Sequence, residues 1–261
     1  GSTYPRSLCR TSEIVGVQIY RELREWLEYH GVELISHATC TDVLCDDNGV
    51  TGARLLVDGV PRVVSAPVVI AAWGGAGSLL PNSTYPWDVD GRGISMLARA
   101  GVELRDLEFV EFEPMVTLSP AGAKGEPCPT AMLGEGAYLL NSKGERFMLK
   151  LRPEGEAGSP KTLINRAIWE QLAAGNSSPN GGAFVDLRHI PLKTLEGYPW
   201  FYNRLIRAGH DPKIELLEVG PAPHSHSGGA VVDSGYATRV DGLYAVGEAS
   251  GGVHGACRLA G

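Results

Sequence analysis

The stretch that decides the fold is Gly242-Leu-Tyr-Ala-Val-Gly247-Glu248-Ala-Ser-Gly251-Gly252-Val-His254-Gly255-Ala-Cys-Arg258-Leu-Ala-Gly261. It reads as a short apolar strand that ends in Gly-Glu and leads into a glycine-rich loop with one His and one Arg. Glycines let a backbone approach a flat or phosphorylated ligand closely. A carboxylate just past a strand can accept hydrogen bonds from ligand hydroxyl groups. The stretch therefore predicts a strand followed by a ligand-binding loop.

Two histidines precede this stretch, in Pro221-Ala-Pro-His224-Ser-His226-Ser-Gly228-Gly229. Alternating histidines on a strand can face one side and bind a metal, but no third ligand follows nearby in the sequence. We therefore expect no metal site here.

The bulk composition describes an ordinary globular protein of 261 residues, with 43% hydrophobic and 20% charged residues. A net charge of −7 argues against a nucleic-acid surface. No apolar run approaches the ~20 residues needed to span a bilayer, and no charged-then-apolar signal peptide opens the chain. We expect a cytoplasmic protein with neither a nucleic-acid partner nor a transmembrane segment of its own.

The cysteines are odd in number and form no C-x-x-C pair, which favours reduced, structural thiols in a cytoplasmic protein. They are Cys9, Cys40, Cys45, Cys128 and Cys257.

The first third of the chain predicts a helix, a β-meander and a glycine turn. Val15, Ile19, Leu23 and Trp26 form one apolar stripe, which indicates a helix over residues 13–30. Asp46-Asp47-Asn48-Gly49 is a strong hairpin signal. Strands are expected over 32–36, 41–45, 50–56 and 62–65, and a buried strand over 68–72 leads into Trp73-Gly74-Gly75-Ala76-Gly77. This order suits a dinucleotide-binding fold with a small inserted antiparallel sheet. The glycine turn alone is more typical of a plain strand-to-helix connection, and only together with the later motifs does it favour a cofactor-side role.

Residues 115–223 differ in character and predict a second domain. Prolines and glycines at 119–129 mark a loop. The elements expected after it are strands over 134–141 and 144–148, a helix over 162–174, a strand over 183–186 and a helix over 198–208. We expect this region to close over a substrate as a lid, with a rigid β-rich subdomain as the alternative.

The motifs together resemble the FAD-dependent succinate dehydrogenase, fumarate reductase and L-aspartate oxidase flavoproteins. The match is close at residues 242–248 and 252–259, dense over 68–114, and looser at 224–229. The resemblance implies an α/β fold, α+β overall, in which part of a Rossmann-like FAD-binding domain (1–113 and 224–261) carries an inserted α+β capping domain (114–223). No G-x-G-x-x-G occurs in the chain, so we expect a fragment of a longer flavoprotein that alone binds FAD weakly or not at all and is inactive.

The resemblance also implies roles for individual residues. The family's Arg proton donor corresponds to Lys161, which could shuttle a proton although it lacks the planar fork of an arginine; a solvated lysine at a helix start is the alternative. His224 and Arg258 correspond to groups that bind the substrate carboxylate, and a guanidinium matches a carboxylate bidentately. The residues expected on the cofactor side are Gly74, Gly75, Gly77, Gly247, Glu248, His254 and Arg258.

Two departures from the family pattern concern the substrate. A substrate-contacting His becomes Glu113 in Glu111-Phe112-Glu113-Pro114, and the run Pro129-Thr130-Ala131-Met132-Leu133-Gly134-Glu135 lacks the family's Thr-Glu pair and its Arg. An anion at position 113 would repel a dicarboxylate by about 1–4 kcal/mol. A substrate with fewer negative charges, or with an amine or apolar part, fits better than succinate or fumarate.

The leading hypothesis is therefore an FAD-dependent oxidoreductase acting on CH–CH donors, which passes hydride between flavin N5 and a small organic acid or related substrate. Lys161, His224, Arg258 and Glu113 are the candidate catalytic residues. By family, an electron-transfer partner could hold the protein at the inner membrane. The alternatives are a non-catalytic binding or assembly module derived from this fold, and a flavin dehydrogenase of a less charged substrate.

Overall fold

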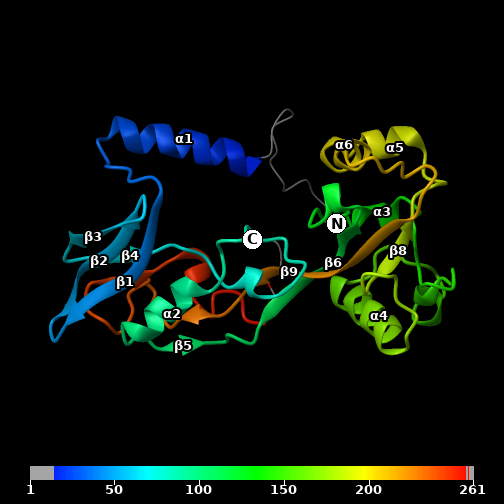
Figure 1. The fold of residues 1–261 in the computed structure, drawn as a ribbon. Helices are drawn as coiled ribbons and strands as arrows, with labels where there is room; N and C mark the ends of the chain where they lie inside the picture. The colour runs from blue at the N-terminus through cyan, green and yellow to red at the C-terminus, as the bar shows by residue number, and fades with distance from the viewer. Residues whose placement is uncertain (1–14, 257, 259–261) are drawn as a thin grey trace.

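The computed structural model describes residues 15–256 and residue 258, and mixes helices with several sheets. A long helix, α1 (Val15–Tyr29), comes first and confirms the predicted amphipathic helix (Figure 1). Its apolar stripe is largely exposed, because Ile19, Leu23 and Trp26 each keep more than half of their surface accessible.

An antiparallel meander follows α1, with strands β1 (Ala38–Asp46), β2 (Gly49–Val57) and β3 (Val60–Ser65). Asp46 pairs with Gly49, so the chain reverses at the predicted hairpin turn. The predicted strand over 32–36 is wrong, because these residues form no regular element. His37, at the entry to β1, instead has a positive φ of 52°, and this left-handed conformation interrupts an extended chain.

Four short strands form two pairs beside the glycine loops. β4 (Val69–Ala71) pairs in parallel with β11 (Leu243–Ala245), and the short strands β5 (Leu104–Arg105) and β10 (Gly229–Ala230) form a second pair. The helix α2 (Arg92–Arg99) completes a small core with these strands, whose buried residues are Val50, Ala71, Leu97, Val102, Ala230, Leu243 and Ala245. β4 is shorter and less buried than expected, since Ile70 is 61% exposed.

The largest sheet has the order β6-β9-β8-β7 and is antiparallel. Its strands are β6 (Val110–Ser119), β7 (Tyr138–Leu140), β8 (Ala183–Asp186) and β9 (Leu217–His226). The helices around it are α3 (Ala131–Gly134), α4 (Lys161–Ala173), α5 (Leu192–Glu196) and α6 (Pro199–Arg207). They enclose a second core that includes Met132, Leu139, Ile168, Leu195 and Phe201.

The predicted strand over 144–148 is wrong, and a 3₁₀ turn, η3 (Phe147–Lys150), takes its place. The Asn141 side chain accepts hydrogen bonds from the backbone N–H groups of Lys143 and Glu145, and Gly144 has a φ of 77°. This local turn reverses the chain, so Phe147 and Met148 enter the core from a turn. The strand expected over 134–141 likewise shortens to β7, because residues 131–134 are helical.

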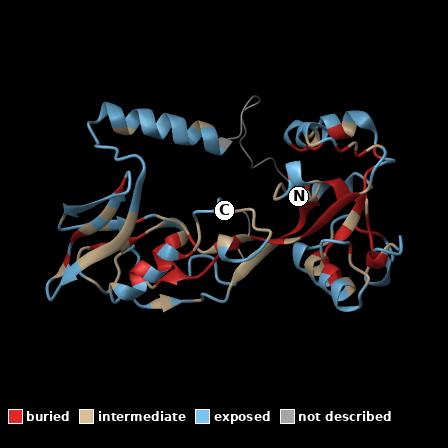
Figure 2. Cartoon of the chain, in the orientation of Figure 1, coloured by how far each residue is buried: buried red, intermediate tan, exposed pale blue. Residues whose placement is uncertain are grey.

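The two cores are separate, and β6 and β9 run between them side by side (Figures 1 and 2). In Figure 2 the buried residues gather in two groups at either end of this strand pair. None of the described helices is both long enough and apolar enough to cross a membrane.

Candidate functional site at the β6–β9 crossing

Several of the expected site residues lie at the β6–β9 crossing, the stretch where these two paired strands pass from one core to the other. Glu113, on β6, and His224, on β9, lie at this crossing. Lys161 is the first residue of α4, and Glu248 follows β11 in a 3₁₀ turn, η4 (Gly247–Ala249). Each of these side chains therefore belongs to, or closely follows, a hydrogen-bonded element.

His224 occupies a β-bulge. Ser225 pairs with Glu111 and Pro223 pairs with Phe112, so His224 has no partner on β6. Bulges re-aim a side chain and are common beside active sites. Thr84 Oγ1 donates to the Pro223 carbonyl and lies 3.0 Å from His224 Nδ1. This arrangement makes Nδ1–H the donor to Thr84 and leaves Nε2 for another partner.

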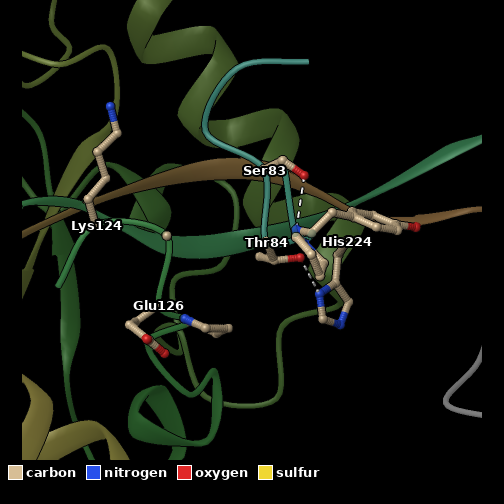
Figure 3. Close-up of a pocket in the computed structure, with 9 residues that line it drawn as sticks. Ser83, Thr84, Lys124, Glu126 and His224 are labelled. Carbon is tan, nitrogen blue, oxygen red and sulfur yellow. Dashed lines mark hydrogen bonds between the residues drawn. The ribbon is translucent and has the colours of Figure 1, made fainter. Parts of the chain in front are cut away.

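His224 and Thr84 line an open pocket of about 480 Å³ between residues 83–86 and residues 124–127. Figure 3 shows Thr84 and His224 pointing toward each other, with Lys124 and Glu126 across the pocket from them. The pocket lies beside the crossing and is wide enough for a small polar molecule.

Lys161 and Glu113 form a direct ion pair, with 2.6 Å between Lys161 Nζ and Glu113 Oε2. The Glu113 side chain is 8% exposed and that of Lys161 is 44% exposed. Asn165 also donates to the Phe112 carbonyl at 2.8 Å, so the start of α4 is tied twice to β6. Glu113 is thus not the isolated anion on which the expected repulsion of a dicarboxylate depended.

Arg258 lies beside the other glutamate of the same strand. Its Nε is 3.8 Å from Glu111 Oε2, while Ser225 Oγ donates to that same oxygen at 2.7 Å. Among the described residues, Arg258 Nε is buried without a hydrogen-bond partner. The guanidinium therefore keeps donors for a further acceptor.

Glu248 is held by two donors. The backbone N–H of His226 lies 2.7 Å from Glu248 Oε1, and the Tyr85 hydroxyl donates to the same oxygen. Burial and the adjacent Glu248 carboxylate raise the pKa of Tyr85, so Tyr85 stays protonated and keeps donating. Within the part of the chain that the structure describes, both donors use Oε1, so Glu248 Oε2 remains for another donor.

The glycines of the predicted cofactor loops are glycine for different structural reasons. A Cβ at Gly77 would lie 2.0 Å from the Tyr85 ring, and one at Gly75 would lie 2.8 Å from the His226 Cβ. Gly74 has a φ of 79°. These three glycines are therefore required by packing and backbone conformation within the chain itself. Gly247 has a φ of 61° and no atom within 4 Å of an added Cβ, which leaves its backbone open.

His254 lies in the exposed part of the glycine loop. The described residues contain no cluster of three or more His, Cys, Asp or Glu side chains that could hold a metal ion. Cys40, Cys45 and Cys128 are free thiols, and Cys9 and Cys257 lie outside the described residues.

A family model described as an FAD binding domain matches residues 4–261. The chain belongs to this FAD-binding family. It is 34% identical over 264 residues to a fumarate reductase (CoM/CoB) chain of Methanothermobacter marburgensis, with 100% of this chain and 48% of that protein covered. It is 37% identical over 238 residues to the L-aspartate oxidase of Caulobacter vibrioides, with 88% and 44% covered. The FAD-binding chain thus spans about half the length of these curated relatives.

A solved structure agrees with these relatives. The E. coli quinol fumarate reductase superposes with a TM-score of 0.79 at 31% identity, covering 92% of the FAD-binding chain and 44% of that chain. The family resemblance seen in the sequence, the α/β fold class and FAD as the cofactor are confirmed.

The residues of the FAD-binding chain fit that cofactor. Buried polar atoms without a partner in the described part of the chain include His226 Nδ1, Ser227 Oγ and Arg258 Nε. His226 Nε2 donates to the Leu107 carbonyl at 3.0 Å, so Nδ1 is an acceptor. Together with the open backbone at Gly247 and the second oxygen of Glu248, these atoms offer donors and acceptors to a polar ring and its hydroxyl groups.

Sequence reasoning did not assign Tyr85, Glu111 or Ser225 to the site. Glu111 stands in the quoted run 111–114, two residues before Glu113, and this spacing on a strand puts both carboxylates on one face. Tyr85 carries no comparable signal, because its partner Glu248 lies 163 residues further along the chain.

Proposed function

We propose that the chain forms part of an FAD-dependent oxidoreductase that acts on a small organic acid. One observation supports this most: three candidate groups meet along residues 111–113 of β6. Arg258 lies beside Glu111, the bulged His224 stands opposite this segment, and Lys161 is paired with Glu113. A carboxylate anchor and a proton donor side by side suit a reaction at a carbon next to a carboxylate.

The substrate would be oriented by Arg258 and His224. Arg258 would donate to a substrate carboxylate with two parallel N–H groups, and His224 would add a donor from Nε2 when its ring is protonated. Glu248, Gly247 and the buried acceptor of His226 would hold FAD. Bound FAD supplies hydride exchange at its N5 atom.

Lys161 would move the proton that accompanies this exchange. In the reducing direction its Nζ–H would protonate the substrate carbon next to the one that accepts hydride, and in the oxidising direction the neutral amine would take the proton back. The buried Glu113 carboxylate, 2.6 Å from Nζ, would hold the Lys161 side chain in one orientation.

We also propose two domains, residues 1–113 with 224–261 around FAD, and residues 114–223 as the cap. The buried residues of one core lie between Met115 and Val219, and those of the other lie between Val50 and Val102 and from Ala230 onward. Both boundaries fall inside paired strands, β6 and β9. The solved relative is named a quinol fumarate reductase, which supports an electron-transfer partner that could place the protein beside a membrane.

The test uses the full-length protein. We expect absorption bands near ~370 and ~450 nm from bound oxidised flavin, bleached by a substrate acid or restored by one after chemical reduction. Lys161→Ala should keep the flavin bands and lower turnover by about 10²–10⁴-fold, the usual contribution of a positioned acid or base. Lys161→Arg should recover part of the turnover, and Lys193→Ala, an exposed lysine on α5, is the control.

Unchanged turnover in Lys161→Ala would remove the proton-donor assignment. A flavin that is retained but exchanges electrons with no organic acid would instead favour a binding or assembly module.

A further inference from the structure

Two glutamates on one face of β6 each lie beside one of the two cationic side chains of the proposed site. Glu111 and Glu113 are two residues apart on a strand, so their side chains leave the same face. Glu111 faces Arg258 and Glu113 faces Lys161. These four groups carry two formal positive and two formal negative charges, so they contribute no net charge to the site.

The two pairs differ in how available the cation is. Lys161 is engaged at hydrogen-bond distance, 2.6 Å, by a buried carboxylate. Arg258 Nε stands 3.8 Å from Glu111, beyond hydrogen-bond distance. The Glu111 oxygen nearest to Arg258 already accepts a hydrogen bond from Ser225. One cation is therefore available to an incoming carboxylate and the other is already neutralised.

A second substrate carboxylate would face a different environment from the first. Beside Glu113 it would compete with a buried carboxylate for Lys161, or leave that carboxylate buried without its partner, and both outcomes are unfavourable. An apolar group at the same place meets a pair that is neutral as a unit. The Cys128 thiol also lies near Glu113, where burial first and the Glu113 charge second raise its pKa, so it stays neutral and leaves the charge balance unchanged.

We infer that the site selects a monocarboxylic acid: Arg258 binds the one carboxylate, and the Glu113–Lys161 pair excludes a second carboxylate from the other end of the substrate. This inference rests on the proposed function, because it takes Arg258 as the substrate anchor. Glu113 then determines specificity, because it neutralises the cation that a second carboxylate would need.

The test compares two acids with one carbon skeleton, crotonate and fumarate, which differ by a methyl group in place of a carboxylate. Each is titrated into the full-length, flavin-loaded protein, and the change in the flavin absorption spectrum gives its dissociation constant. We expect crotonate to bind about tenfold more tightly than fumarate, as one unfavourable charge contact predicts.

The variants aim to reverse this preference. Glu113→Gln removes the buried charge that occupies Lys161, so fumarate affinity should rise while crotonate affinity changes little. Glu111→Gln keeps an acceptor for Ser225 and removes a charge beside Arg258, the anchor that both acids use, so it should change the two affinities alike. Glu108→Gln, an exposed acid just before β6, should leave both affinities unchanged.

Tighter binding of fumarate than of crotonate by the unmodified protein, with electron exchange, would overturn the inference and leave the proposed function standing. An unchanged ratio in flavin-loaded Glu113→Gln would also overturn it. If neither acid perturbs a bound flavin or exchanges electrons with it, both the inference and the organic-acid assignment fail.

Discussion

At the scale of single residues, buried charge in this chain is matched by a specific partner. Glu156 has a 2% exposed side chain and accepts from Arg146 Nη2 at 2.5 Å. The Arg146 guanidinium also lies over the Tyr138 ring, 4.2 Å from its centroid. The pair and the ring contact close one side of the larger core, beside β7.

Removing Arg146 should therefore destabilise the protein. In Arg146→Ala, Glu156 would be a buried carboxylate without its cation, and we expect the free energy of unfolding to fall by about 2–4 kcal/mol. The expected loss is smaller than for a fully buried pair because the Arg146 side chain is 35% exposed. The free energy of unfolding in urea measures it. Arg166→Ala, which breaks the exposed Arg166–Glu170 pair, should change it by no more than about 0.5 kcal/mol; equal losses in the two variants would contradict this account.

The sequence could nominate individual candidate residues for the site but not their pairing. Lys161, Glu113, His224 and Arg258 could be selected because each stands in a short motif. The Lys161–Glu113 ion pair joins residues 48 positions apart, and short-range patterns carry no information on such contacts. Considered singly, Glu113 predicted repulsion of an anion; with its partner, it is a neutralised group.

At the scale of elements, the larger sheet depends on close backbone approach between β8 and β9. A Cβ at Gly182 would lie 2.0 Å from the Val219 carbonyl oxygen, which is closer than non-bonded atoms can approach. Opposite it, a Cβ at Gly220 would come within 3.4 Å of the Gly182 Cα. The absence of side chains at these two positions lets β8 pair with β9 beneath Leu118.

Gly182→Ala should consequently disturb the start of β8 and cost about 1–3 kcal/mol, as overpacking usually does. The matched control is Gly134→Ala at the end of α3, where an added Cβ has no atom within 4 Å. Thermal unfolding followed by circular dichroism compares the two variants. A Gly182→Ala protein as stable as the control would mean that the sheet can shift to accept the methyl group.

Regular elements were predictable where one local signal dominated. The apolar stripe of α1 and the hairpin turn at residues 46–49 are of this kind. The strands β6 and β9 were missed because prolines at 114, 221 and 223 and charged residues at 111 and 113 argue against a strand in isolation. Pairing with each other, with bulges at the irregular positions, stabilises what local propensity does not.

At the scale of the whole molecule, the pH dependence of stability follows from groups that titrate differently in the folded and unfolded chain. Burial lowers the pKa of His210, against a smaller opposing effect of Glu215 and Asp211. Arg188 lowers the pKa of Asp186 by hydrogen bonding its carboxylate. In both cases the unfolded chain binds more protons at low pH, so acid favours unfolding.

The two groups act in different pH windows. The His210 contribution is present above the ordinary histidine pKa of about 6.5 and is lost as the pH falls below it. The Asp186 contribution is lost only below about pH 4. Urea unfolding between pH 7.5 and 5.5 should therefore show falling stability in the unmodified protein and a shallower fall in His210→Gln. The control His37→Asn, at an exposed histidine with positive φ, should keep the slope of stability against pH seen in the unmodified protein. A steeper fall of stability in His210→Gln would mean that the His210 contribution has the opposite sign.

The pairing of β6 with β9 has a mechanical consequence. The two cores are joined by two chain segments that are hydrogen-bonded to each other, and neighbouring strands twist more strongly in a two-stranded ribbon than in a larger sheet. His224 and Glu113 stand near the middle of that ribbon. A change in this twist would turn the two cores relative to each other and rotate both side chains. The orientation of the proposed substrate-binding His224, and of the Glu113 that holds Lys161, would then depend directly on the relative orientation of the two cores.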